Sequence, residues 1–168
     1  ICGQGPGQGS SMGGGTNYYF ALDVTNPADP RPMWEISHVN AGGHLTMGET
    51  WSVPVLGRIN DSGTPRWVAF MGSGYDNIGQ GYAGRYFYVV RVDTGEVIRT
   101  DAINEVNTAL FTAPRVPYAN IAAAIVASPS TIDTNSDGFV DSVYVGDLDG
   151  RLYRLDTSGS VVSSWTFT

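Results

Sequence analysis

The sequence has one cysteine, few charged residues and no long apolar run. A single thiol cannot form an internal disulfide, and Cys2 has no nearby histidine to activate it, so it is either a free thiol or pairs with a cysteine outside this segment. Because no stretch of 18 apolar residues exists, we expect no membrane-spanning segment. The first residues, ICGQGPGQGS, lack the basic end and apolar stretch of a signal peptide, although the chain could be an excised piece of a secreted protein.

Basic residues are scarce and scattered. The chain has 9 Lys and Arg residues against 16 Asp and Glu, which gives a formal net charge of −7. A nucleic-acid surface needs clustered positive charge to displace counterions from phosphates, so we expect no nucleic-acid partner. The acidic balance fits either a cation ligand or a solvated surface.

Recognisable catalytic arrangements are missing as well. No nucleophile elbow and no Ser/His/Asp arrangement can be identified, and no RGD tripeptide is present. His38 and His44 lie in a Gly-rich connection without a third ligand at zinc spacing. We therefore expect a non-enzymatic protein.

What the sequence has in quantity is glycine and apolar residues. Hydrophobic residues make up 42% of the 168 residues, aromatic residues 11%, and there are 22 Gly and 9 Pro. This composition predicts one domain built from many short strands joined by tight turns rather than from long helices.

A repeated phrase supports that prediction. Each copy is a strand, a turn containing Gly or Asn and Pro, and a second strand, and the copies cover 18–24 with 33–36, 85–92 with 96–98, and 151–156 with 160–162. The second and third copies are each preceded by a further pair of predicted strands, at 52–60 with 66–72 and at 127–133 with 141–146, and these two pairs also match each other. Glycine suits these turns because it accepts a positive φ.

Repeating four-strand units are typical of propeller blades. We therefore predict an all-β chain that forms a partial or modified β-propeller of four-stranded antiparallel blades, about two and a half in number. The expected parts are a flexible Gly-rich lead-in (1–16) and a propeller-like fragment (17–168), which contains a half blade (17–38), a blade (51–100), an insertion (101–120) and a last blade (121–168). Because so few blades cannot close a ring, we expect the remainder of the same propeller as a partner.

Three local expectations follow from the same pattern. Residues 102–111 are the one helix candidate, and 121–127 are expected as a buried strand because the run precedes Ser-Pro. The four tryptophans fall within or beside predicted strands and are expected in the core: Trp34, Trp51, Trp67 and Trp165.

The strongest chemical motif is the segment DTNSDGFVD at 133–141. It places side-chain oxygens at its first, third, fifth and ninth positions, on Asp133, Asn135, Asp137 and Asp141. Calcium takes six to eight oxygen ligands, and one short loop can supply most of them. Three carboxylates in nine residues repel one another unless a cation lies between them, so we predict a Ca²⁺ site.

The motif has the opening features of an EF-hand loop. Gly138 permits a sharp turn, and Phe139 can offer its backbone carbonyl. It departs from that loop at position 12, where Tyr144 replaces the bidentate Glu, so Asp141 would have to complete the shell with water. The flanking segments also predict strands rather than helices. The alternative without metal is a turn rich in Asp and Asn. The similar run at 147–150 is more simply explained as an Asp-Gly hairpin turn.

These residues, in this order, resemble a known family. The segments GGGTNYYFALDVTNPADPRPMWEI, FMGSGYDN, YFYVVRVDTGEVI and DTNSDGFVDSVYVGDLDGRLYRLD are similar to the C-terminal propeller of type IV pilus tip adhesins, the PilC/PilY family. The resemblance implies an extracellular protein at the pilus tip or outer-membrane surface that acts in pilus assembly, twitching motility and adhesion. It implies pilins or minor pilins as partners, and a possible host or abiotic surface ligand. It also implies that the 133–141 loop binds calcium and regulates pilus extension and retraction.

Two other functions fit parts of the pattern. A quinoprotein dehydrogenase has propeller blades with similar phrases, but it needs a pyrroloquinoline quinone cavity on the ring axis, which a local hairpin loop does not provide. A generic surface propeller could instead bind glycans or proteins through its long loops.

Overall fold

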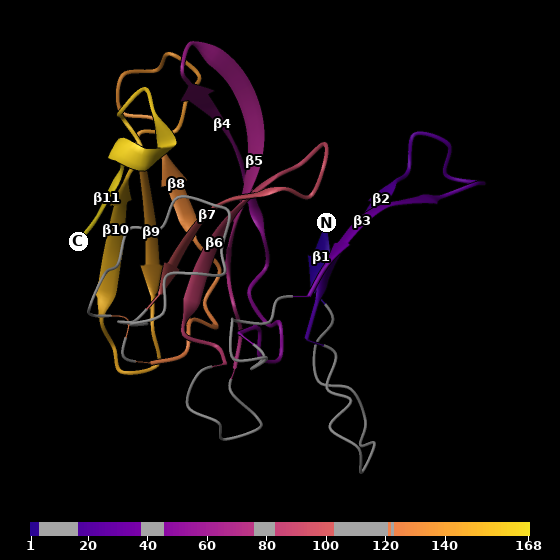
Figure 1. Cartoon of the computed structure of the whole chain (residues 1–168), viewed down its shortest axis with the longest axis horizontal. Coiled ribbons are helices and arrows are strands. Elements are labelled where there is room, and N and C mark those ends of the chain that lie inside the picture. The colour runs from indigo at the N-terminus through magenta and orange to yellow at the C-terminus, as the bar shows by residue number, and fades with distance from the viewer. Residues whose placement is uncertain (4–16, 38–45, 76–82, 103–120, 122) are drawn as a thin grey trace.

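The computed structural model describes residues 1–3, 17–37, 46–75, 83–102, 121 and 123–168. Within them, nearly all regular structure is β-strand, and the strands form three antiparallel sheets that follow one another across the molecule (Figure 1). The elements are β1 (Cys2–Gly3), β2 (Tyr19–Asp23), β3 (Arg31–Ile36), β4 (Val55–Asp61), β5 (Thr64–Gly72), β6 (Tyr86–Arg91), β7 (Val97–Ala102), β8 (Ser130–Ile132), β9 (Ser142–Gly146), β10 (Leu152–Asp156), the 3-10 turn η2 (Val162–Ser164) and β11 (Thr166–Phe167).

Each sheet is a simple meander. The first sheet has the order β1-β2-β3, the second β4-β5-β6-β7 and the third β11-β10-β9-β8. The prediction of an all-β chain with four-stranded antiparallel blades is therefore confirmed. Among the described residues, no helix has the length and apolar character needed to cross a membrane.

The second sheet is covered on both faces, which explains the apolar runs of β5 and β6. Consecutive residues of a strand point to opposite faces. Phe87 and Val89 belong to the cluster shared with the third sheet, whereas Tyr86, Tyr88 and Val90 belong to the cluster shared with the first. All five are almost completely buried. A strand buried on both faces cannot alternate apolar with polar residues, and this one does not.

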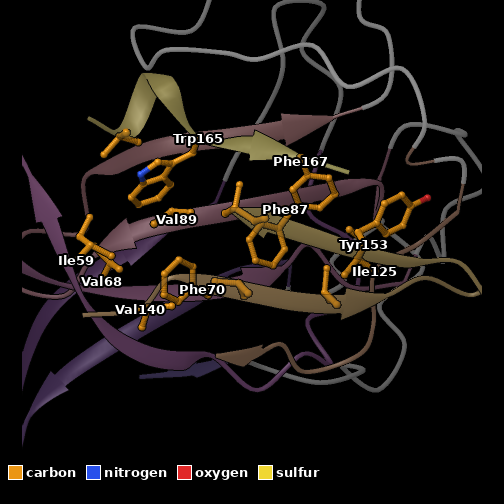
Figure 2. Packing of buried hydrophobic residues seen from close by; sticks show 14 of the residues in the cluster. Ile59, Val68, Phe70, Phe87, Val89, Ile125, Val140, Tyr153, Trp165 and Phe167 are labelled. Carbon is orange, nitrogen blue, oxygen red and sulfur yellow. The ribbon is translucent and has the colours of Figure 1, made fainter. Parts of the chain in front are cut away.

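The larger core lies between the second and third sheets (Figure 2). Phe70 of β5 and Phe87 of β6 lie in one cluster with Tyr153 of β10 and Phe167 of β11, and the Phe87 ring lies beside that of Phe167. The Phe167 ring centre lies 5.8 Å from that of Phe87 and 5.3 Å from that of Tyr153. These contacts join the two sheets as neighbouring layers.

The last predicted strand is wrong in position. The two valines before Ser163 predict a strand at 160–162, but the chain forms η2 there and reaches the sheet only at β11. Trp165 is buried, and its indole N–H donates to the Gly159 carbonyl at 2.9 Å. Arg99, also buried, donates to the Val162 and Trp165 carbonyls at 3.0 and 3.1 Å. These hydrogen bonds hold the chain in a turn before β11 begins.

Residues 121–127 also differ from the prediction. Ile121, Ala123, Ala124 and Ile125 are buried as expected, but none of the described residues here belongs to a strand. The backbone of Ile125 instead accepts from Gly74 N–H at 3.0 Å and donates to the Gly84 carbonyl at 2.8 Å. Single hydrogen bonds to different loops replace a strand ladder, so this segment is a buried connection.

Two of the four tryptophans are not in the core. Trp165 is 2% exposed and Trp34 is half-buried, but Trp51 is 54% and Trp67 58% exposed. Trp51 lies in a connection, and Trp67 points away from the face that its neighbour Val68 buries. Alternation along the strand permits this, and apolar character alone does not exclude it.

The remaining local expectations fall mostly outside the described residues. The Gly-rich lead-in (1–16) was expected to be flexible, but its residues Cys2 and Gly3 form β1 and pair with Phe20 and Tyr19 of β2. Ala102 ends β7, so this strand occupies the first two positions of the expected insertion. Residues 103–120, with most of the helix candidate, lie outside the described residues, as do 4–16.

Candidate metal centre

The predicted metal loop connects β8 to β9. Its ends are held together by the pairing of Ile132 with Ser142 and by the Asp141 N–H, which donates to the Ile132 carbonyl at 2.8 Å. Strands therefore flank the loop on both sides, as the sequence predicts. Because the pairing closes the loop, its ends are already together before any ligand binds.

Asp133, at the start of the loop, accepts two backbone hydrogen bonds. One carboxylate oxygen accepts from Ser136 N–H at 2.6 Å and the other from Gly138 N–H at 2.9 Å. Ser136 and Gly138 have φ values of 63° and 85°, which is the left-handed region. These two turns curl the chain around the Asp133 carboxylate, and glycine at the second of them adopts this φ without strain.

The next two predicted ligands continue the pattern. The Asn135 side-chain oxygen accepts from Asp137 N–H at 2.9 Å, and one Asp137 oxygen accepts from Phe139 N–H at 2.8 Å. The Asn135 amide donates to the other Asp137 oxygen at 3.1 Å. Each side-chain oxygen that accepts one hydrogen bond keeps a second lone pair, so these contacts orient the oxygens without using their full capacity.

Asp141 closes the loop through Thr134, a residue that sequence reasoning missed. The backbone N–H of Thr134 donates to Asp141 Oδ2 at 2.7 Å, and the Thr134 hydroxyl makes a short hydrogen bond to the same oxygen. These bonds, the hydroxyl first, hold the pKa of the Asp141 carboxyl below its usual value because they stabilise the charged form. The carboxylate is therefore ionised at neutral pH.

The C-terminal end of the loop is anchored on the second sheet. The guanidinium carbon of Arg58 lies 4.8 Å from the centre of the Phe139 ring, and Val140 N–H donates to the Arg58 carbonyl at 2.8 Å. Val140 is buried, whereas residues 133–138 are exposed. Sequence reasoning had no signal for Arg58, because the contact depends on how two sheets pack.

The residues of the loop fit a calcium ion in chemistry but are not gathered around one point. All the predicted donors are oxygens, as a hard cation requires: the side chains of Asp133, Asn135, Asp137 and Asp141 and the carbonyl of Phe139. Among the residues that the structure describes, however, no three His, Cys, Asp or Glu side chains are placed together to hold a metal. Their hydrogen bonds run mostly to the loop backbone, and in part to the Asn135 amide and the Thr134 hydroxyl.

The other acidic run, at 147–150, forms the turn between β9 and β10. The side chain of Asp147 is buried, and its carboxylate accepts from the N–H groups of Asp149 and Arg151 at 3.0 and 2.9 Å and from the Tyr153 hydroxyl at 2.8 Å. A carboxylate used in this way fixes a turn, which agrees with the prediction. His38 and His44 lie outside the described residues.

The fold and the loop can be compared with known proteins. A family model described as the PilY1 beta-propeller domain matches residues 8–167. The chain belongs to the PilY1 beta-propeller family. The predicted resemblance to the PilC/PilY propeller is thereby confirmed.

Curated and solved members of the PilY1 family are also similar to this chain in sequence or structure. The type IV pilus biogenesis factor PilY1 of Pseudomonas aeruginosa is 30% identical over 148 residues, which cover 88% of this chain and 11% of that protein. A PilY1 homolog of Xylella fastidiosa is 31% identical over 158 residues, which cover 91% of this chain and 10% of that protein. The crystal structure of the P. aeruginosa PilY1 C-terminal domain matches with a TM-score of 0.60 and 27% identity, over 84% of this chain and 24% of that one. The chain thus spans about a tenth of the length of these curated relatives.

Proposed function

We propose that this chain is a non-enzymatic, calcium-binding propeller module of a type IV pilus tip-associated adhesin. Its role is in pilus biogenesis, twitching motility and surface adhesion, at the pilus tip or outer-membrane surface. The observation that supports the pilus role is membership of the PilY1 family, whose curated members are named type IV pilus biogenesis factors. This membership favours the pilus module over a quinoprotein dehydrogenase.

The calcium part of the proposal is supported by the loop at 133–141. Its ends are held by β-pairing, its expected ligand atoms are all oxygen, and its first, third and fifth side chains already accept hydrogen bonds from backbone N–H groups of the loop. A cation would bring the carboxylates of Asp133, Asp137 and Asp141 to one centre and cancel their repulsion. The Thr134 contact to Asp141 would loosen or be shared as that carboxylate turned to the ion.

Because a metal that binds only the folded loop stabilises the fold by mass action, the first test is thermal. The purified protein is melted in EGTA and in calcium from micromolar to millimolar concentration. At about 100 times the dissociation constant, binding adds about 2.7 kcal/mol, and in a domain of this size each kcal/mol raises Tm by roughly 2–4 °C. We expect a rise of roughly 5–10 °C, and a smaller one with magnesium.

Two variants make the thermal test specific. The double substitution Asp133→Ala and Asp141→Ala should abolish the calcium response. Asp149→Ala removes an exposed carboxylate from the other turn of the same sheet and should leave the response intact. A melting temperature that does not change over the whole calcium range would refute the calcium site.

The pilus role is tested separately in the bacterium that makes the protein. Deletion of this segment should reduce surface pili and twitching, and the protein should recover pilins or minor pilins in a pull-down. If deletion affects pili but the double variant does not, the pilus role stands and calcium is not its regulator.

A further inference from the structure

The C-terminal end of the predicted metal loop is part of the protein core. Residues 133–138 are exposed. Val140, between the predicted ligands Phe139 and Asp141, is 8% exposed and belongs to the cluster shared by the second and third sheets (Figure 2). A Cβ added to Gly57 of β4 would lie 2.6 Å from Cγ2 of Val140. The last two predicted ligands are therefore neighbours of a residue that is packed against the second sheet.

The peptide group between Phe139 and Val140 is oriented by the second sheet. Its N–H, on Val140, donates to the Arg58 carbonyl of β4 at 2.8 Å. The N–H and the C=O of a planar trans peptide point in opposite directions. The hydrogen bond to β4 therefore directs the Phe139 carbonyl, the one main-chain ligand of the predicted set, away from that strand. This orientation is set by a contact between two sheets and needs no cation.

Thr157 holds the peptide groups on both sides of Asp141. This threonine directly follows β10, and its hydroxyl donates to the Val140 carbonyl at 2.5 Å. Its backbone N–H donates to the Asp141 carbonyl at 2.9 Å. The Asp141 N–H, in turn, donates to the Ile132 carbonyl at 2.8 Å. The backbone that carries the Asp141 carboxylate is thus fixed by three hydrogen bonds to residues outside 133–141.

A hydroxyl is not what packing alone would place at position 157. Alternate residues of a strand share a face, and Tyr153 and Leu155 of β10 belong to the apolar core cluster. Thr157 continues this series and is 5% exposed. Valine has nearly the shape of threonine, and a buried hydroxyl costs free energy unless it is hydrogen-bonded. The polar group here is matched to the backbone carbonyl of Val140, at the edge of the predicted site.

We propose that Thr157 is a positioning residue of the calcium site, through its hydrogen bonds to the backbone on either side of Asp141. The proposal rests on the calcium function proposed above. A backbone that is already fixed loses less conformational freedom when the Asp141 carboxylate binds an ion, so the affinity of the loop is higher. The role differs from that of Thr134, which contacts the Asp141 carboxylate itself.

Calcium affinity, measured by competition with a chromophoric chelator on the protein as the bacterium makes it, tests the proposal. The calcium bound by the loop is the fraction that the double substitution Asp133→Ala with Asp141→Ala removes. Thr157→Val removes the hydroxyl and keeps the branched shape, whereas Thr157→Ser keeps the hydroxyl and removes the methyl group. We expect Thr157→Val to weaken calcium binding by the loop roughly threefold to tenfold, as the loss of one hydrogen bond would. Thr157→Ser should keep the affinity of the wild-type protein.

Melting in EGTA separates this role from a purely structural one. Both substitutions should lower Tm without calcium, since Thr157→Val takes a hydrogen bond from the Val140 carbonyl and Thr157→Ser removes a buried methyl group. A threonine that acts on stability alone would therefore lower Tm in both variants and leave the calcium affinity unchanged in both.

Several results would overturn the positioning role. Wild-type affinity in Thr157→Val, or an equal loss in Thr157→Val and Thr157→Ser, would show that Thr157 acts on stability alone, and the calcium site itself would stand. A wild-type protein whose loop binds no calcium would instead refute the proposed calcium function, and the positioning role with it. If Thr157→Val does not fold, Gly57→Ala replaces it, because the added Cβ would displace Val140 from the side of β4. Unchanged affinity in that variant would also overturn the proposal.

Discussion

The contact between the first and second sheets makes a quantitative prediction at Gly95. This residue lies in the turn between β6 and β7 with φ at +74°, and a Cβ added to it would lie 2.6 Å from Cγ of Trp34 on β3. The indole cannot easily move away, because its N–H donates to the Val92 carbonyl at 2.8 Å. Gly95→Ala therefore has two costs, one from the backbone and one from the collision.

The two costs can be separated with a matched glycine. Gly63, in the turn between β4 and β5, has φ at +83° and no atom within 4 Å of an added Cβ. Gly63→Ala should therefore cost only the left-handed backbone term, about 1–2 kcal/mol. Gly95→Ala should cost that amount plus about 1–3 kcal/mol for overpacking against the indole.

Guanidinium denaturation of the two variants measures the difference in the free energy of unfolding. A loss of several kcal/mol is a large part of the 5–15 kcal/mol typical of a domain. In a Trp34→Gly background the three nearest contacts, which are all with the Trp34 side chain including its Cβ, are absent, so Gly95→Ala should then cost no more than Gly63→Ala. Equal costs for the two substitutions with Trp34 present would refute the packing of Trp34 on this turn.

Three further predictions follow from buried or charged groups. Tyr19→Phe should cost about 1–3 kcal/mol of unfolding free energy, because the buried hydroxyl lies 3.0 and 2.8 Å from the Ser52 and Gly72 carbonyls; an unchanged denaturation midpoint would contradict this. Arg99→Met should cost roughly 2–3 kcal/mol and speed amide exchange in β11, because the Val162 and Trp165 carbonyls lose the guanidinium as a donor; unchanged exchange there would count against it. Without calcium, the NMR titration midpoint of Asp141 should lie below that of an ordinary Asp and rise toward it in Thr134→Val, because the hydroxyl that lowers the pKa is removed. The lowered pKa of Asp141 adds stability that is fully present above the pKa of the unfolded state and is lost as the pH falls through the pKa of the folded state. A midpoint that Thr134→Val leaves unchanged would show that the hydroxyl is not the cause.

Local pattern was a good guide to the strands. The repeated sequence pattern correctly predicted β2, β6 and β10 and the turns that follow them. The alternation of side chains along a strand and the position of glycine in a turn are both set by neighbouring residues. The pattern was wrong at 160–162, where the carbonyls bound by Arg99 hold a turn in a segment of strong β propensity. It was also wrong for Trp51 and Trp67, since apolar character does not say which face another sheet covers.

In the candidate metal loop, too, local sequence predicted some residues and missed others. Spacing alone selected Asp133, Asn135, Asp137, Phe139 and Asp141, because ligands of one short loop are fixed by local sequence. Thr134 had no signal beyond its place beside Asp133, and Arg58 belongs to another sheet. Whether the carboxylates gather around a cation depends on their hydrogen bonds to the backbone, which composition does not reveal.

By itself, then, the sequence determined the all-β class, the repeated strand pairs and the oxygen-rich loop. Each of these depends on residues within about ten positions of one another, where period and turn chemistry act directly. Only the tertiary structure decided that the second sheet is buried on both faces and that the loop is anchored on Arg58. These depend on contacts between distant segments, and burial is a property of the packed sheets rather than of any one strand.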